Sequence, residues 1–185
     1  MKGFGVRTVG HPERVTTHTR FQLGSTSKAI TSALVAILVK KKMLSLNQPI
    51  EAIPEATLWH LLTHTTGIPS GGFNTLIEKG VSAADIYKQI QKTPPHAPPG
   101  QQFAYHNAVY SMIGGVVEQQ TKLSFEQALQ KWLFGPLHMT ETSSTWDSFI
   151  SSPNHVSVHA FVNGKEKKGK KGKNSKTSNT CAVKV

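Results

Sequence analysis

Two residue types suited to acyl transfer, Ser25 and Lys28, lie three positions apart at the start of an apolar run with helical spacing. If a helix begins here, three residues span nearly one turn, so both side chains lie on the same face. A serine hydroxyl is a poor nucleophile until a base takes its proton, and a neighbouring amine can be that base. The helix N-terminus disfavours positive charge on Lys28 and offers N–H groups to a developing oxyanion. The pair therefore forms a minimal device for acyl transfer.

The same two residues also have a structural interpretation. Ser25 is a suitable N-cap residue, and Lys28 would then be a solvated side chain of the first helical turn. Serine and lysine occur at this spacing in many helices, so the tetrapeptide alone favours the structural role. The choice between the two depends on residues further along the chain.

A second polar group, Tyr105 and Asn107, precedes another apolar run with helical spacing. A tyrosine hydroxyl close to a Ser–Lys pair can relay a proton. An asparagine amide can donate to a substrate carbonyl and accept from a substrate N–H. Both residue types therefore suit the chemistry indicated by the Ser–Lys pair.

Ser-x-x-Lys followed by Tyr-x-Asn resembles the penicillin-binding-protein and serine β-lactamase superfamily. Within it, the chain looks closest to the branch of class C β-lactamases, D-Ala-D-Ala carboxypeptidases and esterases. The similarity covers about residues 3–145 and is carried by residues 21–31 (FQLGSTSKAIT), residues 61–69 (LLTHTTGIP), Pro99-Gly100 ahead of Tyr105, and residues 136–142 (PLHMTET). Lys42 and His138 stand where the family usually has glycine.

The resemblance implies a role for each of these polar residues. Ser25 would be the acylated nucleophile, and Lys28 would take its proton or hold that proton's position. Tyr105 would move protons to the leaving group and, in hydrolysing members, help to activate water. Asn107 would orient Lys28 and bind the acyl amide of the substrate. The backbone N–H of Ser25 would be half of the oxyanion hole, and the identity of the general base, lysine or tyrosine, stays open.

The function implied is that of a serine hydrolase that forms an acyl-enzyme on Ser25. The substrate would be a small molecule or a peptidoglycan-type peptide: a β-lactam, a D-Ala-D-Ala peptide or an ester. No metal or organic cofactor is implied. An alternative is a catalytically impaired, truncated remnant, because the family's third motif, a Lys- or His-led triad ending in Gly, has no convincing match.

The fold class predicted is α+β, namely the mostly helical domain of the β-lactamase/transpeptidase-like fold with only part of its antiparallel sheet. Residues 1–20 would be an N-terminal remnant of the sheet, and residues 21–150 the helical domain. Residues 151–163 could add one strand, and residues 164–185 are expected to be a lysine-rich disordered tail.

Local signals place the helices and loops of the helical domain. Helices are expected from Thr26 to about Lys42, after Thr57, over residues 83–92 behind Ser82, after Asn107, and after Ser124. The proline-rich segment 94–100 must be a loop. Trp59 and Trp132 are expected in the core, and His64 is expected to be a structural loop residue rather than a catalytic base.

The formal net charge of +11 is concentrated in lysines after Gly164. A flexible segment of this kind would bind polyanions weakly, with strong salt dependence. It has no interleaved aromatic residues for base stacking, so specific nucleic-acid recognition is not indicated. A simply solvated tail, or translation past a frameshift, explains the same composition.

Several signals of location and ligation are missing from the sequence. No apolar run has transmembrane length, and the first residues lack a signal peptide's apolar core, so export is not expected. This conflicts with the family, which usually works in the periplasm or outside the cell. Cys181 is the only cysteine, and the histidines have no metal-ligand spacing. Localisation and oligomeric state stay open.

Overall fold

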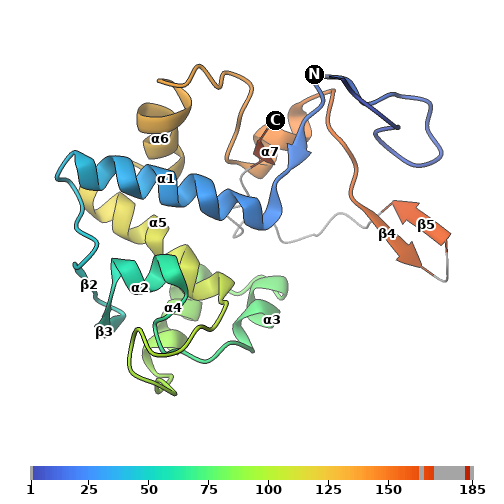
Figure 1. Cartoon of the computed structure of the whole chain (residues 1–185). Coiled ribbons are helices and arrows are strands. Elements are labelled where there is room, and N and C mark those ends of the chain that lie inside the picture. The colour runs from blue at the N-terminus through green and yellow to red at the C-terminus, as the bar shows by residue number, and fades with distance from the viewer. Residues whose placement is uncertain (1, 163–164, 169–181, 184–185) are drawn as a thin grey trace.

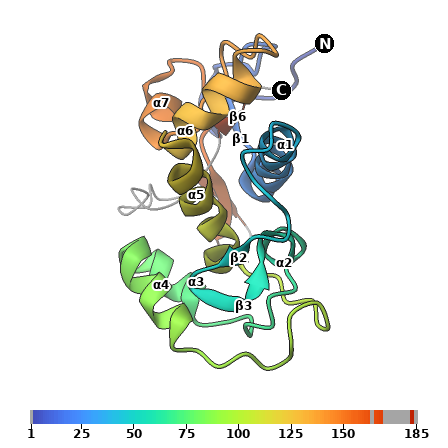
Figure 2. The same cartoon turned by 90° about the vertical axis from the view of Figure 1, so that its left-hand side faces the viewer.

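Helix α5 (Asn107–Thr121) is the centre of the fold, and α2 (Leu58–Thr63), α3 (Phe73–Glu78), α4 (Ala83–Gln91) and α6 (Phe125–Leu129) all pack against it. The computed structural model describes residues 2–162, 165–168 and 182–183. Helix α1 (Ser27–Lys40) follows a short 3-10 turn, η1 (Gly24–Thr26). Figure 2 shows α5 lying between α1 and α4. A π-helical turn, η2 (Gln130–Phe134), extends α6, and α7 (Trp146–Ser151) follows (Figure 1).

The strands described are short and form three antiparallel pairs. β2 (Pro49–Ile50) pairs with β3 (Ile53–Thr57), β1 (Phe21–Gln22) with β6 (Ala182–Val183), and β4 (His159–Val162) with β5 (Lys165–Lys168). The prediction of an α+β fold, mostly helical with only part of an antiparallel sheet, is therefore confirmed.

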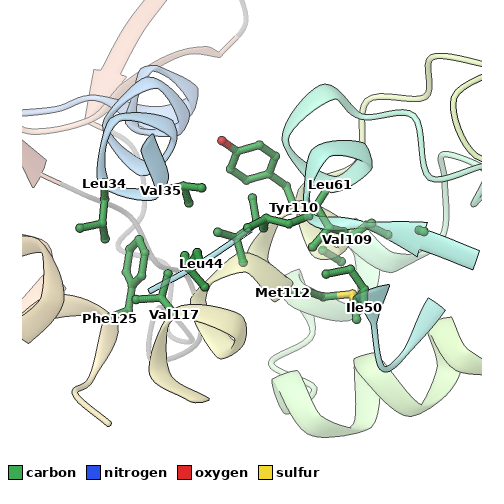
Figure 3. Close-up of a cluster of buried hydrophobic side chains, with 14 of the residues drawn as sticks. Leu34, Val35, Leu44, Ile50, Leu61, Val109, Tyr110, Met112, Val117 and Phe125 are labelled. Atoms are coloured by element: carbon green, nitrogen blue, oxygen red, sulfur yellow. The ribbon is translucent and has the colours of Figure 1, made fainter. Parts of the chain in front are cut away.

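The core lies between the long helices and the β2–β3 hairpin (Figure 3). Helix α1 contributes Leu34, Val35 and Leu38, because residues three and four apart share one face of a helix. Helix α5 has seven buried residues between Ala108 and Val117, which suits an element that is covered on several sides. Trp132 packs against this core as predicted, whereas Trp59 is 52% exposed, so its predicted core position is wrong. The reason is that Trp59 lies on the outer face of α2, beside the buried Leu58 and Leu61.

Helix starts follow the capping residues expected from the sequence. Thr57 and His60 cap α2 reciprocally, the Ser82 hydroxyl accepts from the Asp85 N–H at α4, and Ser124 and Gln127 form a capping box at α6. Helix α1 ends at Lys40, slightly before the predicted end, and Lys42 turns the chain with φ of +59°. Helices α3 and α7 and the β2–β3 hairpin were not predicted.

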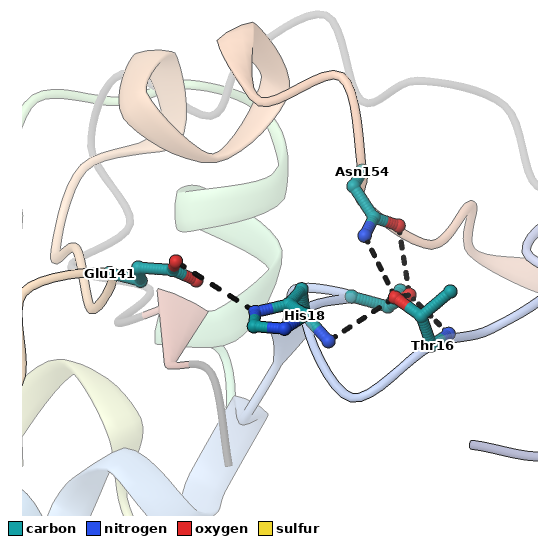
Figure 4. A network of polar contacts seen from close by, with 5 residues as sticks. Thr16, His18, Glu141 and Asn154 are labelled. Atoms are coloured by element: carbon teal, nitrogen blue, oxygen red, sulfur yellow. Dashed lines mark hydrogen bonds and ion pairs between the residues drawn. The ribbon is translucent and has the colours of Figure 1, made fainter. Parts of the chain in front are cut away.

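The N-terminal segment contacts Glu141 and Asn154 rather than forming a strand of its own (Figure 4). Within residues 2–20 the pairing described consists of isolated bridges. The Thr19 hydroxyl donates to Asn154 Oδ1 at 2.8 Å, and Asn154 Nδ2 donates to Thr16 Oγ1 at 3.1 Å. His18 lies 4.0 Å from the Glu141 carboxylate. These contacts tie the chain ahead of Ser25 to the segment that carries α7.

Two parts of the segment predicted to be a disordered tail form short strands in the structure. Residues 165–168 pair with β4, and residues 182–183 pair with β1, while the other residues of 164–185 lie outside the described part of the chain. Strands β4 and β5 are separated in sequence by Asn163-Gly164, the pair of residue types most favourable for a two-residue hairpin connection. The composition of this segment predicted disorder, although Asn-Gly is a local sequence signal for a hairpin.

Candidate active site

Ser25 lies on the 3-10 turn directly ahead of α1, and its neighbour Gly24 has φ of +53°. A positive φ of this size favours glycine, so Gly24 allows the sharp entry that places Ser25 at the surface. The N-cap residue of α1 is Thr26, not Ser25, and Lys28 is half-buried in the first turn. The alternative interpretation, a capping serine with a solvated lysine, is therefore wrong.

Tyr105 reaches Ser25 from the loop that precedes α5. Its hydroxyl donates to Ser25 Oγ at 2.8 Å, across 80 positions of sequence. The loop is anchored to the end of α2, because the Ala104 N–H donates to the His64 carbonyl at 2.9 Å. The position of Tyr105 is thus fixed by a contact with the C-terminal end of α2, although Tyr105 precedes α5 in sequence.

The side chain of Lys28 is held in place by the first residue of α5. Its Nζ donates to Asn107 Oδ1 at 2.8 Å and lies 4.9 Å and 5.4 Å from the ring centroids of Tyr105 and Tyr110. Electron-rich ring faces and an amide oxygen both stabilise an ammonium group. The four residues named from the sequence, Ser25, Lys28, Tyr105 and Asn107, therefore form one cluster.

Tyr110 joins the same cluster, although sequence analysis did not identify it. Its hydroxyl donates to the Lys28 carbonyl at 2.9 Å and lies 3.0 Å from Ser32 Oγ. These bonds tie the first turns of α1 to α5. The sequence did carry a signal, because Tyr110 follows Asn107 by three residues and so lies on the same face of α5.

Two histidines, His64 and His106, support the start of α5. The His106 N–H donates to His64 Nδ1 at 3.2 Å, and His106 Nδ1 accepts from the Val109 N–H at 3.4 Å as the N-cap of α5. The His64 ring lies 4.5 Å from the ring of Tyr105 and 5.0 Å from that of Tyr110. His64 thus lies at the site itself, where its Nδ1 accepts a backbone hydrogen bond, whereas no role was predicted for His106.

The protonation of these groups follows from burial and from Lys28. Burial, and then the Lys28 charge, lower the pKa of His64, while burial and then His64 lower the pKa of His106. Both rings are therefore neutral near pH 7 and remain acceptors. A hydrogen bond with Lys28, followed by that with Ser25, lowers the pKa of the Tyr105 hydroxyl. Burial instead raises the pKa of Tyr110.

A cavity of about 380 Å³ adjoins the cluster. It lies along α5, between the start of α1 on one side and α3 and α4 on the other, and Ser25, Lys28 and Asn107 line one end of it. Within the described residues, no group of three or more His, Cys, Asp or Glu side chains is arranged to hold a metal ion. No helix in the same part of the chain is long and apolar enough to cross a membrane.

Comparisons with known proteins agree on one family. A family model described as Beta-lactamase matches residues 1–164. Protein flp of Staphylococcus aureus (strain COL) is 28% identical over an alignment of 156 residues that covers 77% of this chain and 31% of that protein. The Beta-lactamase of Escherichia coli (strain K12) is 31% identical over an alignment of 149 residues that covers 75% of this chain and 38% of that protein.

Solved structures show the same likeness in three dimensions. The octameric penicillin-binding protein homologue from Pyrococcus abyssi aligns with a TM-score of 0.77 at 26% identity, covering 88% of this chain and 41% of that one. The chain therefore spans well under half the length of these relatives.

Proposed function

Because this chain belongs to the beta-lactamase family, we propose that it is a serine hydrolase that works through an acyl-enzyme on Ser25. The observation that carries the proposal is the 2.8 Å hydrogen bond between the Tyr105 hydroxyl and Ser25 Oγ. A nucleophilic serine needs a proton acceptor within such a distance, and that acceptor needs a third group to orient it. Lys28, held by Asn107, lies beside the Tyr105 ring and meets this need.

In the first half of the proposed reaction, Tyr105 as phenolate takes the proton of Ser25 while Oγ attacks the substrate carbonyl carbon. The lowered pKa of Tyr105 favours this assignment of the base, and Lys28 supplies the positive charge that stabilises the phenolate. The backbone N–H of Ser25 would donate to the oxyanion. Collapse of the tetrahedral intermediate breaks the bond to the leaving group, which takes the proton from Tyr105.

In the second half, Tyr105 takes a proton from water, whose oxygen attacks the acyl carbon. Breakage of the bond to Oγ releases the acid, and the proton returns to Ser25. Asn107 Oδ1 accepts from Lys28, so its amide nitrogen is the part suited to donate to the substrate. The substrate class at this level is a β-lactam, a D-Ala-D-Ala peptide or an ester.

The decisive measurement is intact mass after exposure to a fluorophosphonate, a penicillin and an activated ester. We expect a stoichiometric adduct that is absent from Ser25→Ala and present in Ser70→Ala, a matched change at an exposed loop serine. No adduct on protein shown to be folded would overturn the proposal and favour the catalytically impaired alternative. Polyanion binding by residues 164–185 stays a sequence-based prediction, since most of that segment lies outside the described residues.

A further inference from the structure

We propose that the cavity along α5 binds the acyl chain of the substrate, and that this chain is an uncharged aliphatic one. The inference rests on the proposed function, because it assigns the acyl side of the same site. The inference narrows the proposed substrates to esters of apolar carboxylic acids. It excludes substrates whose acyl part carries a charge.

The two sides of Ser25 differ in their surroundings. Ser25, Lys28 and Asn107 line the cavity, whereas Tyr105 is not among the described residues that line it and is 42% exposed. Tyr105 is the group that would protonate the leaving group, so the leaving group must lie on its open, solvent-facing side. The carbonyl carbon bonded to Ser25 then has its other substituent directed toward the cavity.

The far walls of the cavity are apolar. Ile77 from α3, Ile86 from α4, Ile113 from α5 and Phe125 from α6 line it. Apolar chains gain free energy in proportion to the surface that such walls remove from water. The part of the cavity lined by these four residues is therefore suited to hydrocarbon.

Two of the polar side chains that line the cavity, Tyr87 and Ser111, are partners of each other. The Tyr87 hydroxyl lies 3.3 Å from Ser111 Oγ, and burial raises the pKa of Tyr87, so this pair is neutral at neutral pH. Among the described residues that line the cavity, Lys28 alone carries a formal charge, and it donates to Asn107. A carboxylate or ammonium at the far end of the acyl chain would lose its water without gaining a counter-charge.

The cavity has a volume of about 380 Å³. This volume leaves room for an acyl chain of about six to eight carbons. Small residues keep this space open, among them Ala83, Ala108 and Gly114. Ala83 is exposed and is the first residue of α4. A larger side chain at this position can therefore extend into the cavity without disturbing the core.

The test uses p-nitrophenyl esters from acetate to octanoate on the full chain. We expect kcat/KM to rise at least tenfold from acetate to octanoate. Ala83→Phe should lower the ratio of the octanoate value to the acetate value at least fivefold. Ala84→Phe is the matched control, because Ala84 is the next exposed residue of α4 and does not line the cavity. Equal kcat/KM for all chain lengths would overturn the inference while leaving the proposed hydrolase intact.

A binding measurement separates the inference from the hydrolase proposal. Octanamide should bind to Ser25→Ala, as measured by calorimetry, and bind at least tenfold more weakly when Ala83→Phe is added. The charged analogue 8-aminooctanamide should also bind at least tenfold more weakly than octanamide. Octanamide binding without any ester hydrolysis would support the cavity and overturn the hydrolase. Equal affinity for the charged and uncharged amides, or no binding of either, would overturn the inference.

Discussion

Lys28 Nζ donates a 2.8 Å hydrogen bond to Asn107 Oδ1, joining the first turn of α1 to the first turn of α5. The two residues are 79 positions apart in sequence, so this bond forms only when the helical domain has assembled. It places the ammonium group beside the ring of Tyr105, whose hydroxyl contacts Ser25. The geometry of the whole cluster therefore depends on how α1 and α5 meet.

Asn107→Ala should slow acylation of Ser25. The substitution leaves the half-buried Lys28 ammonium without its amide acceptor, and hydrogen bonds to charged groups contribute about 1.5–3 kcal/mol, or roughly 10- to 150-fold in rate. The measurement is the second-order rate constant for fluorophosphonate labelling. Asn47→Ala, at an exposed turn residue, is the control and should label at the parental rate. An unchanged rate in Asn107→Ala would exclude a positioning role for Asn107.

Tyr105→Phe should mainly slow acylation, whereas Tyr110→Phe should mainly reduce stability. Both rings lie near Lys28 and His64, but of these two hydroxyls only that of Tyr105 donates to Ser25. Tyr105→Phe should lower the acylation rate by about 10²–10⁴, the range for a lost general acid–base. Tyr110→Phe should instead reduce stability by about 1 kcal/mol, because it loses its bonds to the Lys28 carbonyl and to Ser32. Labelling rates and urea unfolding separate the two effects, and similar acylation rates for both variants would contradict the assignment.

The acylation rate should rise with pH as the Tyr105 hydroxyl loses its proton. Its hydrogen bonds with Lys28 and Ser25 lower the pKa of Tyr105 below the usual 10, so the phenolate becomes available earlier than for a free tyrosine. The pH profile of labelling should show this rise in the parent protein. Its persistence in Tyr105→Phe would assign the titration to another group.

Stability should fall when the pH drops below about 6.5, the ordinary pKa of histidine. Burial lowers the pKa of both His64 and His106 in the folded state, so between the folded and unfolded values the unfolded chain binds more protons. The stabilisation is fully present above the unfolded pKa and is lost as pH falls toward the folded values. Protonation also removes the Nδ1 acceptors for the His106 and Val109 N–H groups.

The histidine contribution can be isolated with His106→Asn, because asparagine is an N-cap residue that does not titrate. Urea unfolding at pH 7.5 and pH 5.5 should show a smaller loss of stability on acidification in His106→Asn than in the parent. His96→Asn, at a loop histidine, is the control. An identical pH dependence in parent and His106→Asn would show that His106 does not titrate in this range.

Lys42→Gly and His138→Gly should each stabilise the protein. Both residues stand where the resembled family usually has glycine, and both have positive φ, +59° and +54°. Left-handed backbone costs an L-residue about 1–2 kcal/mol, partly offset by the greater entropy that glycine loses on folding, so a net gain of about 0.5–1 kcal/mol is expected for each. Thermal unfolding measures it. Lys41→Gly, with φ of −80°, is the control and should destabilise.

Local sequence signals determined much of the helical architecture. The spacing of apolar residues located α1 and α5, and Ser82 and Ser124 marked where α4 and α6 begin. These features could be predicted because a helix and its cap form from hydrogen bonds between residues within one or two turns. The Ser-x-x-Lys and Tyr-x-Asn motifs likewise identified the residues of the candidate site before any fold was known.

Tertiary structure alone decided how those residues meet. The contact of His64 with the start of α5, the bond from Tyr110 to the Lys28 carbonyl, and the cavity along α5 each join segments distant in sequence. Strands as short as β1 and β2 carry too few residues for an alternating pattern to show. The physical reason is common to these cases: a long-range contact depends on the packing of several elements at once, whereas periodicity and capping depend only on neighbours along the chain.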